Sequence, residues 1–328
     1  MALSASDVPA WFVQLFAFLF GAAIGSFLNV AIYRWPRDMS VVSPPSHCPG
    51  CGAPVRALHN IPLLGYLFLR GRTACCDTRL SPRYPLVELL TAVLSVAVAQ
   101  MHIVAAPPNA LLFTGVLRTI VDILFVSGLL VATFVDLERM EIPDEVSLPG
   151  AALGLATASL RDPHRVADFA LGAGGGYLIV QLVFVWGYER LTGRRGMGEG
   201  DAKLLLMIGA FLGFQGALFA IVIGALQGVL VAIYGLITGT PLGPDLDALE
   251  QQERAEARAR GETWPDRLEA EEAAAQARGE ATGEPTGEPQ ATYFGHIKLP
   301  FGPFLALGAL EFLFFGDRLF ETWLGLTG

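Results

Sequence analysis

Charged residues are scarce in this sequence. They make up 16% of the 328 residues, while 53% are hydrophobic, and soluble globular proteins carry about 25% charged residues. This shortage excludes an ordinary soluble protein and indicates an integral membrane protein that contacts the lipid bilayer. Basic patches are also lacking, so no nucleic acid partner is expected. The net charge of −9 points to no particular partner, because residues 245–288 alone contain 13 acidic residues and 5 arginines.

Basic residues are absent from the first ten positions, although a secretory signal peptide normally begins with a positively charged region. The apolar run that starts at Trp11 continues through Gly25–Val30 without an evident cleavage site. This segment is therefore expected to be retained as a transmembrane helix.

Eight apolar segments are candidates to cross a bilayer, which takes about 20 apolar residues. The fourth, sixth and eighth are shorter than this length. The segments cover 10–33, 84–105, 114–136, 145–160, 167–188, 202–215, 217–238 and 299–316. The predicted fold is an all-α polytopic membrane protein of about eight transmembrane helices, with a small cytoplasmic cysteine-containing domain after the first helix.

The same segments predict the domain organisation. The expected parts are a first transmembrane helix at 1–33, a cysteine domain at 34–83, a transmembrane catalytic core at 84–239, an acidic low-complexity cytoplasmic insert at 240–297, and a last transmembrane helix with the C-terminus at 298–328. The insert repeats Thr-Gly-Glu-Pro and is rich in Glu, Ala and Arg, so no catalytic role is expected for it.

Lysine and arginine concentrate in alternate loops. If the N-terminus lies outside, the loops at 34–83, 137–144, 189–203 and 239–298 face the cytoplasm and contain 18 of the 22 basic residues. The positive-inside rule favours this orientation. It places the cysteine domain in the cytoplasm.

Two aspartates fall at the same predicted membrane level. Asp136 ends the third segment, and Asp201 follows the glycine-rich stretch Gly196–Gly200 at the start of the sixth. A carboxyl group near hydrocarbon is costly unless it is paired or hydrated, which favours a functional role. The alternative for Asp201 is a helix cap, because Asp is a favoured N-cap residue. Gly198 and Gly200 lack a Cβ and would let a substrate backbone approach closely.

All four cysteines lie in the first loop. Cys48 and Cys51 have the C-x2-C spacing of a zinc knuckle, and a reducing compartment disfavours a disulfide. Cys75 and Cys76 are adjacent, a spacing that does not readily direct two thiolates to one tetrahedral ion. The open alternatives are a zinc site formed by the cysteines, a site completed by His59 or another group, and unliganded structural thiols.

Glycine-rich runs occur inside two segments. Gly172–Gly176 fails the G-x-G-x-x-G pattern and has no preceding strand, so a nucleotide site is not expected. Close helix packing by small residues is predicted there and at Gly21 and Gly25.

Several motifs in order resemble the type IV prepilin peptidases, which are aspartic proteases of the bacterial inner membrane. The motifs are Gly25–Val30 with Tyr33-Arg34, Asn60–Leu64, Arg83–Leu90, Asp136–Glu138 with Ile142–Asp144, Gly196–Leu204, and Leu299–Phe304. The resemblance extends along most of the chain.

The resemblance implies that Asp136 and Asp201 are the catalytic pair and that the substrates are prepilins and pseudopilins with short basic leaders. It also implies N-methylation of the new N-terminus with S-adenosylmethionine, for which the sequence indicates no binding residues. No metal is expected to take part in proteolysis.

The family's cysteine domain usually has two C-x2-C pairs, so a third cysteine is expected at Thr73 and a fourth at Cys76. Cys75 is the candidate replacement in a structural zinc site of Cys48, Cys51, Cys75 and Cys76.

Two other classes of function are compatible with intramembrane carboxylates. An ion-coupled transporter would use them as a proton relay, although transporter sites tend to lie at the midplane within repeated halves. An assembly scaffold would use the cysteine domain and the insert as docking surfaces.

Overall fold

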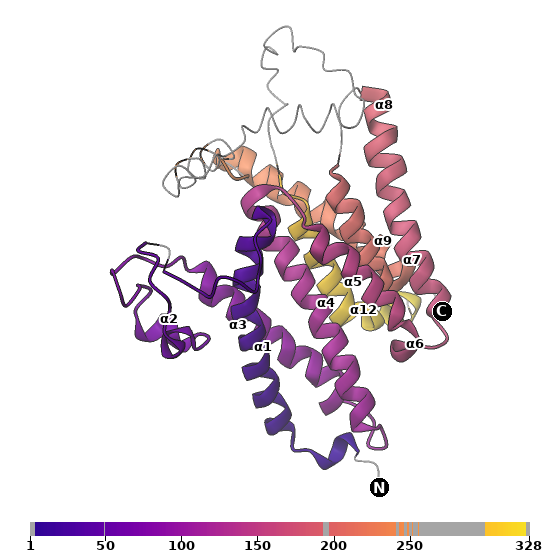
Figure 1. Ribbon diagram of the computed structural model, residues 1–328. Helices are drawn as coiled ribbons and strands as arrows, with labels where there is room; N and C mark the ends of the chain where they lie inside the picture. Colours follow the sequence, from indigo (N-terminus) through magenta and orange to yellow (C-terminus); the bar gives the residue numbers. More distant parts are fainter. Residues whose placement is uncertain are drawn as a thin grey trace. The chain divides into compact units, whose positions relative to one another are not determined.

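The computed structural model describes residues 4–48, 50–192, 197–240 and 299–325, with a few isolated positions between 243 and 255. These residues form helices and no β-strand (Figure 1), which confirms the predicted all-α fold. Contacts divide the chain into two compact units, Met1–Leu230 with Pro300–Gly328, and Val231–Leu299. The first unit contains the helix bundle and the cysteine domain. Most of the predicted insert at 240–297 lies outside the described residues.

The helices follow the predicted apolar segments. Their bounds are α1 Ala10–Arg34, α2 Leu64–Phe68, α3 Arg83–Ala99, α4 Leu112–Arg139, α5 Asp144–Ala156, α6 Ala158–Arg161, α7 Val166–Ile179, α8 Tyr188–Thr192, α9 Glu199–Thr238 and α12 Gly302–Gly325. Turns of π-helix extend α3 over Gln100–Val104 and join α7 to α8 over Val180–Gly187. Within the described residues, five helices are long and apolar enough to cross a membrane. All eight predicted segments overlap helical residues.

The longest helix, α9, is two helices joined at Gly213. This glycine has a φ of 77°, a left-handed conformation that side chains rarely adopt. Arg161 donates hydrogen bonds to the carbonyls of Ala210 and Phe211 before the break. Asp168 accepts one from the N–H of Phe214 after it, at 3.1 Å. The break thus corresponds to the boundary expected between the sixth and seventh segments, and side chains satisfy the backbone groups that it exposes.

Small residues bring helix backbones close together. A Cβ on Gly25 of α1 would lie 2.6 Å from the Cα of Glu88 on α3, and a Cβ on Gly21 would lie 2.9 Å from the Cα of Ala92. On α7, a Cβ on Gly172 would lie 2.3 Å from the carbonyl carbon of Gly213. These contacts confirm the predicted packing role of Gly21, Gly25 and Gly172. Figure 1 shows α1 and α3 running side by side.

The first loop is tied to the bundle by polar side chains. Glu88 of α3 is buried and accepts a hydrogen bond of 2.7 Å from the N–H of Leu63, which has a left-handed φ of 61°. Asn29 of α1 donates to the carbonyl of Tyr84 at 3.0 Å. Arg34 donates to the carbonyls of Ser40 and Pro44. The motifs singled out around these residues therefore serve to anchor the cysteine domain.

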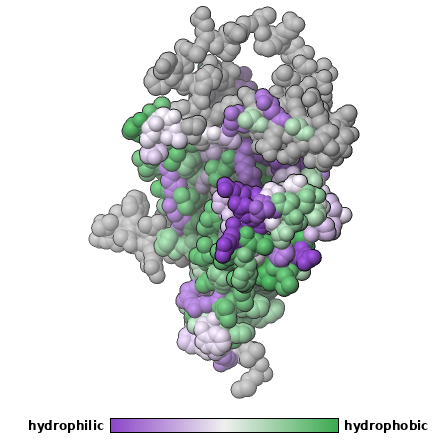
Figure 2. Space-filling view, turned by 90° about the vertical axis from the view of Figure 1, so that its left-hand side faces the viewer, coloured by the Kyte–Doolittle hydropathy of each residue, from purple (hydrophilic) through white to green (hydrophobic). Residues whose placement is uncertain are grey.

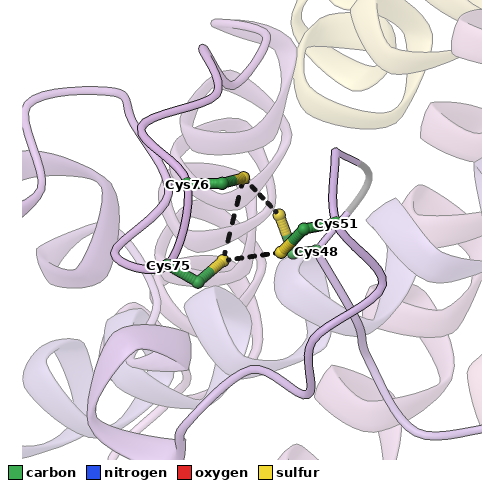
Figure 3. Close-up of side chains that lie close together, drawn as sticks. All are labelled: Cys48, Cys51, Cys75 and Cys76. Atoms are coloured by element: carbon green, nitrogen blue, oxygen red, sulfur yellow. Dashed lines mark hydrogen bonds between the residues drawn. The ribbon is translucent and has the colours of Figure 1, made fainter.

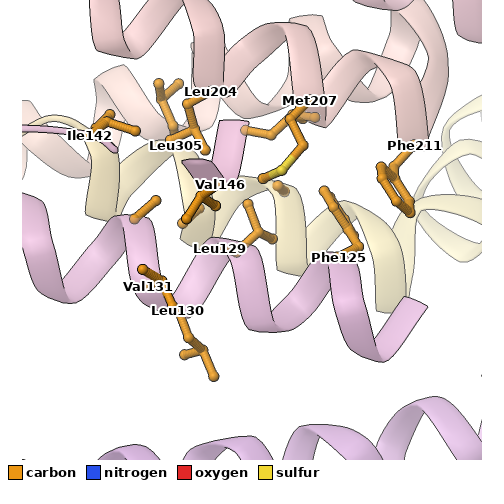
Figure 4. Packing of buried hydrophobic residues seen from close by; sticks show 14 of the residues in the cluster. Phe125, Leu129, Leu130, Val131, Ile142, Val146, Leu204, Met207, Phe211 and Leu305 are labelled. Carbon is orange, nitrogen blue, oxygen red and sulfur yellow. The ribbon is translucent and has the colours of Figure 1, made fainter. Parts of the chain in front are cut away.

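A packed apolar core joins α4, α5, α9 and α12 (Figure 4). The rings of Phe125 on α4 and Phe211 on α9 stack with centroids 4.3 Å apart. Leu129, Leu204 and Leu305 are completely buried. In a membrane the gain from such contacts is van der Waals packing, because lipid tails are as apolar as leucine. The core fixes the helices that carry the two aspartates.

Large hydrophobic side chains also lie on the outside of the bundle. Trp11, Phe12, Phe16 and Phe20 of α1 are between 44% and 66% exposed. Figure 2 shows hydrophobic surface in green beside hydrophilic patches in purple. Exposed apolar surface of this extent is expected where a protein contacts lipid.

Candidate active site

Asp136 lies in the last turn of α4 and is 5% exposed. The helix ends three residues later at Arg139, where Met140 takes a left-handed φ of 54° and donates its N–H to the carbonyl of Asp136 at 2.9 Å. The chain then turns sharply into α5. The carboxylate of Asp136 is therefore fixed near the C-terminal end of α4, where the helix is capped by Met140.

Asp201 lies in the first turn of α9 and is 9% exposed. Its Oδ2 accepts a hydrogen bond of 3.2 Å from the N–H of Gly198. Since α9 begins at Glu199, this contact is the return half of a capping box, in which the third helical residue accepts from the N-cap backbone. The expected N-cap position for Asp201 is thus not observed, but the aspartate does satisfy a backbone group at the helix start.

The two aspartates share one cavity of about 480 Å³. The residues around the cavity are Trp35, Pro36, Asp38, Asp136, Met140, Glu141, Ile142, Pro143, Asp144, Glu145, Gly198, Glu199, Gly200, Asp201 and Lys203. The structure therefore brings together the two side chains that the sequence predicted at one membrane level.

A third helix, α12, contacts the carboxylate of Asp136. Gly302, the first residue of α12, donates its backbone N–H to Oδ2 of Asp136 at 2.8 Å. A Cβ at Gly302 would lie 2.8 Å from that oxygen. No role for Gly302 follows from the sequence, where its place in the motif Leu299–Phe304 is the only signal.

Ile142 packs between the start of α9, at Gly200, and the start of α12, at Gly302. A Cβ on Gly200 would lie 3.0 Å from the Cβ of Ile142, and one on Gly302 would lie 3.2 Å from its Cδ1. Ile142 is 8% exposed. Its side chain therefore sets the spacing between the start of α9 and the start of α12.

Lys203 and Asp144 hold the loop after α4 against α9. The Nζ of Lys203 donates to both carboxylate oxygens of Asp144 at 2.7 Å. Both residues belong to motifs in the sequence that predict no role for either of them. Their pairing shows that the motif around Ile142 and the motif around Asp201 form one structural unit.

Gly198 and Gly200, predicted to bind substrate, both line the cavity. Contact with Ile142 explains why Gly200 lacks a side chain. At Gly198 the nearest atom to an added Cβ is Oδ2 of Asp201, at 3.6 Å, so this position has space beside the aspartate. Substrate binding by these glycines stays a prediction. Gly196, from the same stretch, lies outside the described residues.

The first loop also contributes to the cavity wall, which the sequence did not predict. Trp35 and Pro36 belong to a short 3-10 helix, Trp35–Arg37, that follows α1 directly, and Asp38 caps it with a φ of 52°. The cavity thus combines residues at the start of the first loop, directly after α1, with residues from α4, α5 and α9.

The four cysteines form a separate cluster in the first loop (Figure 3). Their sulfurs all lie within 4.8 Å of one another, with Cys48 and Cys76 at 3.4 Å and Cys51 and Cys75 at 3.3 Å. A tetrahedral zinc with Zn–S bonds of about 2.3 Å requires sulfurs about 3.8 Å apart. The predicted set therefore fits one metal, despite the adjacency of Cys75 and Cys76. Among the described residues the cluster contains no histidine, so His59 has no support as a ligand.

Hydroxyl groups favour a thiolate in this cluster. Hydrogen bonds from Thr73 and Thr78 lower the pKa of Cys76 to about 6. The backbone of Ala53 favours the thiolate of Cys51, but the neighbouring Cys75 opposes it and the pKa of Cys51 rises to about 12. Thr73 occupies the position where a third cysteine was expected, and there it supports the thiolate of Cys76.

Two protein families match the chain. Residues 19–102 match the Bacterial Peptidase A24 N-terminal domain, and residues 123–233 match the Type IV leader peptidase family. No solved structure matches.

Curated relatives give the same result over longer stretches. A protein of Aeromonas hydrophila is 40% identical over 69% of this chain and 82% of its own length, and one of Myxococcus xanthus is 32% identical over 96% and 94%. A protein of Neisseria gonorrhoeae is 34% identical over 70% and 85%. All three are named prepilin leader peptidase/N-methyltransferase. Because the matches cover both the cysteine domain and the helices that carry the aspartates, the chain belongs to the type IV leader peptidase family.

Proposed function

We propose that this protein is a membrane aspartic endopeptidase that removes the short basic leader from type IV prepilins and pseudopilins, with Asp136 and Asp201 as its catalytic pair. The observation that carries this proposal is the meeting of two buried carboxylates, from α4 and α9, in one cavity. The family and the names of the relatives support the same activity.

The geometry suits acid–base hydrolysis of a peptide bond. Two buried carboxyl groups that share one cavity do not both ionise readily, so one carries a proton. The ionised aspartate takes a proton from water, and the water oxygen attacks the scissile carbonyl carbon. The protonated aspartate polarises the carbonyl oxygen and then supplies the proton that the departing amine needs when the C–N bond breaks.

Cleavage is proposed to take place at the cytoplasmic face of the bacterial inner membrane. In the orientation with the N-terminus outside, the end of α4 and the start of α9 lie at this face. The positive-inside rule favours this orientation, because it assigns 18 of the 22 basic residues to cytoplasmic segments. Gly198 and Gly200 are proposed to lie beside the extended substrate backbone. The apolar exterior fits a multi-pass protein whose substrates reach it within the bilayer.

Two accessory roles belong to the proposal. The names of the relatives include N-methyltransferase, which implies methylation of the new N-terminus with S-adenosylmethionine as donor. Cys48, Cys51, Cys75 and Cys76 are proposed to hold a structural zinc, which would join the loop around Cys48 to the turn around Cys76. Neither role enters the proteolytic step.

The transporter alternative is not supported. Both families that match the chain are peptidase families, and the curated relatives are peptidases. The aspartates lie at helix ends in one cavity instead of at the middle of a span. The scaffold alternative is likewise not favoured, because it leaves the shared cavity unexplained.

Coexpression with a prepilin tests the proposal. We expect Asp136→Asn and Asp201→Asn each to lower the cleavage rate by at least about a thousandfold, because each removes one half of the acid–base pair. Asp122 is a matched control, since it is equally buried, pairs with His102 and does not line the cavity. Asp122→Asn should retain cleavage. Mass spectrometry of the product reports the cleavage point and any methyl group together. Wild-type cleavage rates in either active-site variant would contradict the assignment.

A further inference from the structure

Gly302 holds the carboxylate of Asp136 from a distant part of the chain. Its N–H donates to Oδ2 of Asp136 at 2.8 Å, across 166 positions of sequence, and both residues are buried. Among the described residues, no other hydrogen bond reaches this carboxylate. One carboxylate oxygen is thus fixed, and Oδ1 is left for a water molecule in the cavity.

Among the described residues, the N–H of Gly302 donates a hydrogen bond only to Asp136. It belongs to the first residue of α12, and the first four N–H groups of an α-helix lack partners within the helix. Asp136 satisfies this buried donor, and the partial positive charge of the helix N-terminus favours a carboxylate there. The hydrogen bond therefore stabilises both the ionised carboxylate of Asp136 and the N-terminus of α12.

The missing side chain at residue 302 is as important as the N–H. A Cβ there would lie 2.8 Å from Oδ2 and 3.3 Å from Cγ of Asp136. Any side chain would push the carboxylate from its present position. Catalytic groups lose efficiency when displaced by even about 1 Å.

We infer that Gly302 is a positioning residue for proteolysis: its N–H and its lack of a side chain hold Asp136 in the orientation that activates water. This inference rests on the proposed peptidase function. It assigns to α12 a direct share in the active site, which is otherwise formed by α4, α9 and the first loop.

Two variants test the inference by different routes. Gly302→Ala adds the Cβ, and an ester in place of the amide between residues 301 and 302 removes the N–H without adding bulk. The ester leaves no helical acceptor without its donor, because this N–H has no partner within the helix. The carbonyl of Phe301 stays in place to accept from the N–H groups of Phe304 and Leu305, although an ester carbonyl is a weaker acceptor. Each change should lower kcat at least about tenfold, since a hydrogen bond to a charged group is removed or displaced. KM for the prepilin should stay within about twofold, because ground-state binding is not affected.

Controls separate positioning from packing. Gly174 has no atom within 4 Å of an added Cβ, so Gly174→Ala should keep wild-type kcat. The Cβ of Gly302→Ala would also lie 3.2 Å from Cδ1 of Ile142. Ile142→Val removes that atom and should not restore kcat to Gly302→Ala. Full restoration would assign the effect to Ile142 and overturn the inference.

The thermal unfolding midpoint of each variant shows whether it is folded. If Gly302→Ala does not fold, the ester variant still decides. Wild-type kcat in the ester variant, with Asp136→Asn inactive, would overturn the positioning role and leave the peptidase assignment intact. A wild-type protein that cleaves no prepilin would instead overturn the proposed function.

Discussion

At the scale of single residues, the site is built from pairs that connect distant motifs. Asp144 with Lys203 and Gly302 with Asp136 each join segments far apart in the sequence. Sequence motifs located these residues, and the meeting of Asp136 and Asp201 in one cavity could be predicted from their shared membrane level. The partners could not be predicted, because a hydrogen bond from a backbone N–H depends on the three-dimensional arrangement of helices. The reason for a glycine at position 200 could not be predicted either, because it depends on close contact with the side chain of Ile142.

The ion pair between Lys203 and Asp144 provides a test at this scale. The side chains are 27% and 53% exposed, so the pair should contribute only about 0.5 kcal/mol to stability. We expect Lys203→Ala and Asp144→Ala to reduce cleavage by a similar factor, since each releases the same loop from α9. The double variant should lose no more than either single variant. Initial cleavage rates of purified proteins in detergent measure this coupling, and multiplicative losses would show that the residues act separately.

At the scale of elements, helices were easier to predict than their junctions. All eight predicted apolar segments overlap helices, because hydrocarbon imposes a minimum number of apolar residues, and five of the described helices are long and apolar enough to cross a membrane. The break in α9 lies at Gly213, three residues before the expected boundary at 216, because glycine adopts a positive φ without a steric cost. The short helix at Trp35–Arg37 was missed, because nothing in its composition marks it as part of a cavity wall.

The cysteine domain allows a metal test at the element scale. Purified protein should contain about one zinc per chain, Cys48→Ser should lose it, and His59→Ala should keep it, because the four sulfurs alone complete a tetrahedral site. Metal binding should weaken as the pH falls, since protons compete for the thiolates, and Cys51 must lose a proton held with a pKa of about 12. Inductively coupled plasma mass spectrometry after dialysis at several pH values measures zinc content. Equal and negligible zinc in all three proteins would reject the site.

At the scale of the whole molecule, charge and apolar surface together define how the protein lies in a membrane. The exposed aromatic side chains of α1 and the apolar length of five helices require a lipid environment. The excess of basic residues in alternate loops favours the orientation with the N-terminus outside, which stays a prediction. Both aspartates must face the side on which the substrate's leader lies, so orientation and activity are linked.

Accessibility labelling tests this orientation. Leu58 in the first loop is 75% exposed, and His164 between α6 and α7 is exposed. In a background with all four native cysteines replaced by serine, Leu58→Cys should react with a membrane-impermeant maleimide only after cell lysis. His164→Cys should react in intact cells, because its loop lies on the opposite side. Retained prepilin cleavage identifies variants that are correctly folded. The reverse labelling pattern would place the aspartates outside, where a leader that remains in the cytoplasm could not reach them, and would contradict cleavage at the cytoplasmic face.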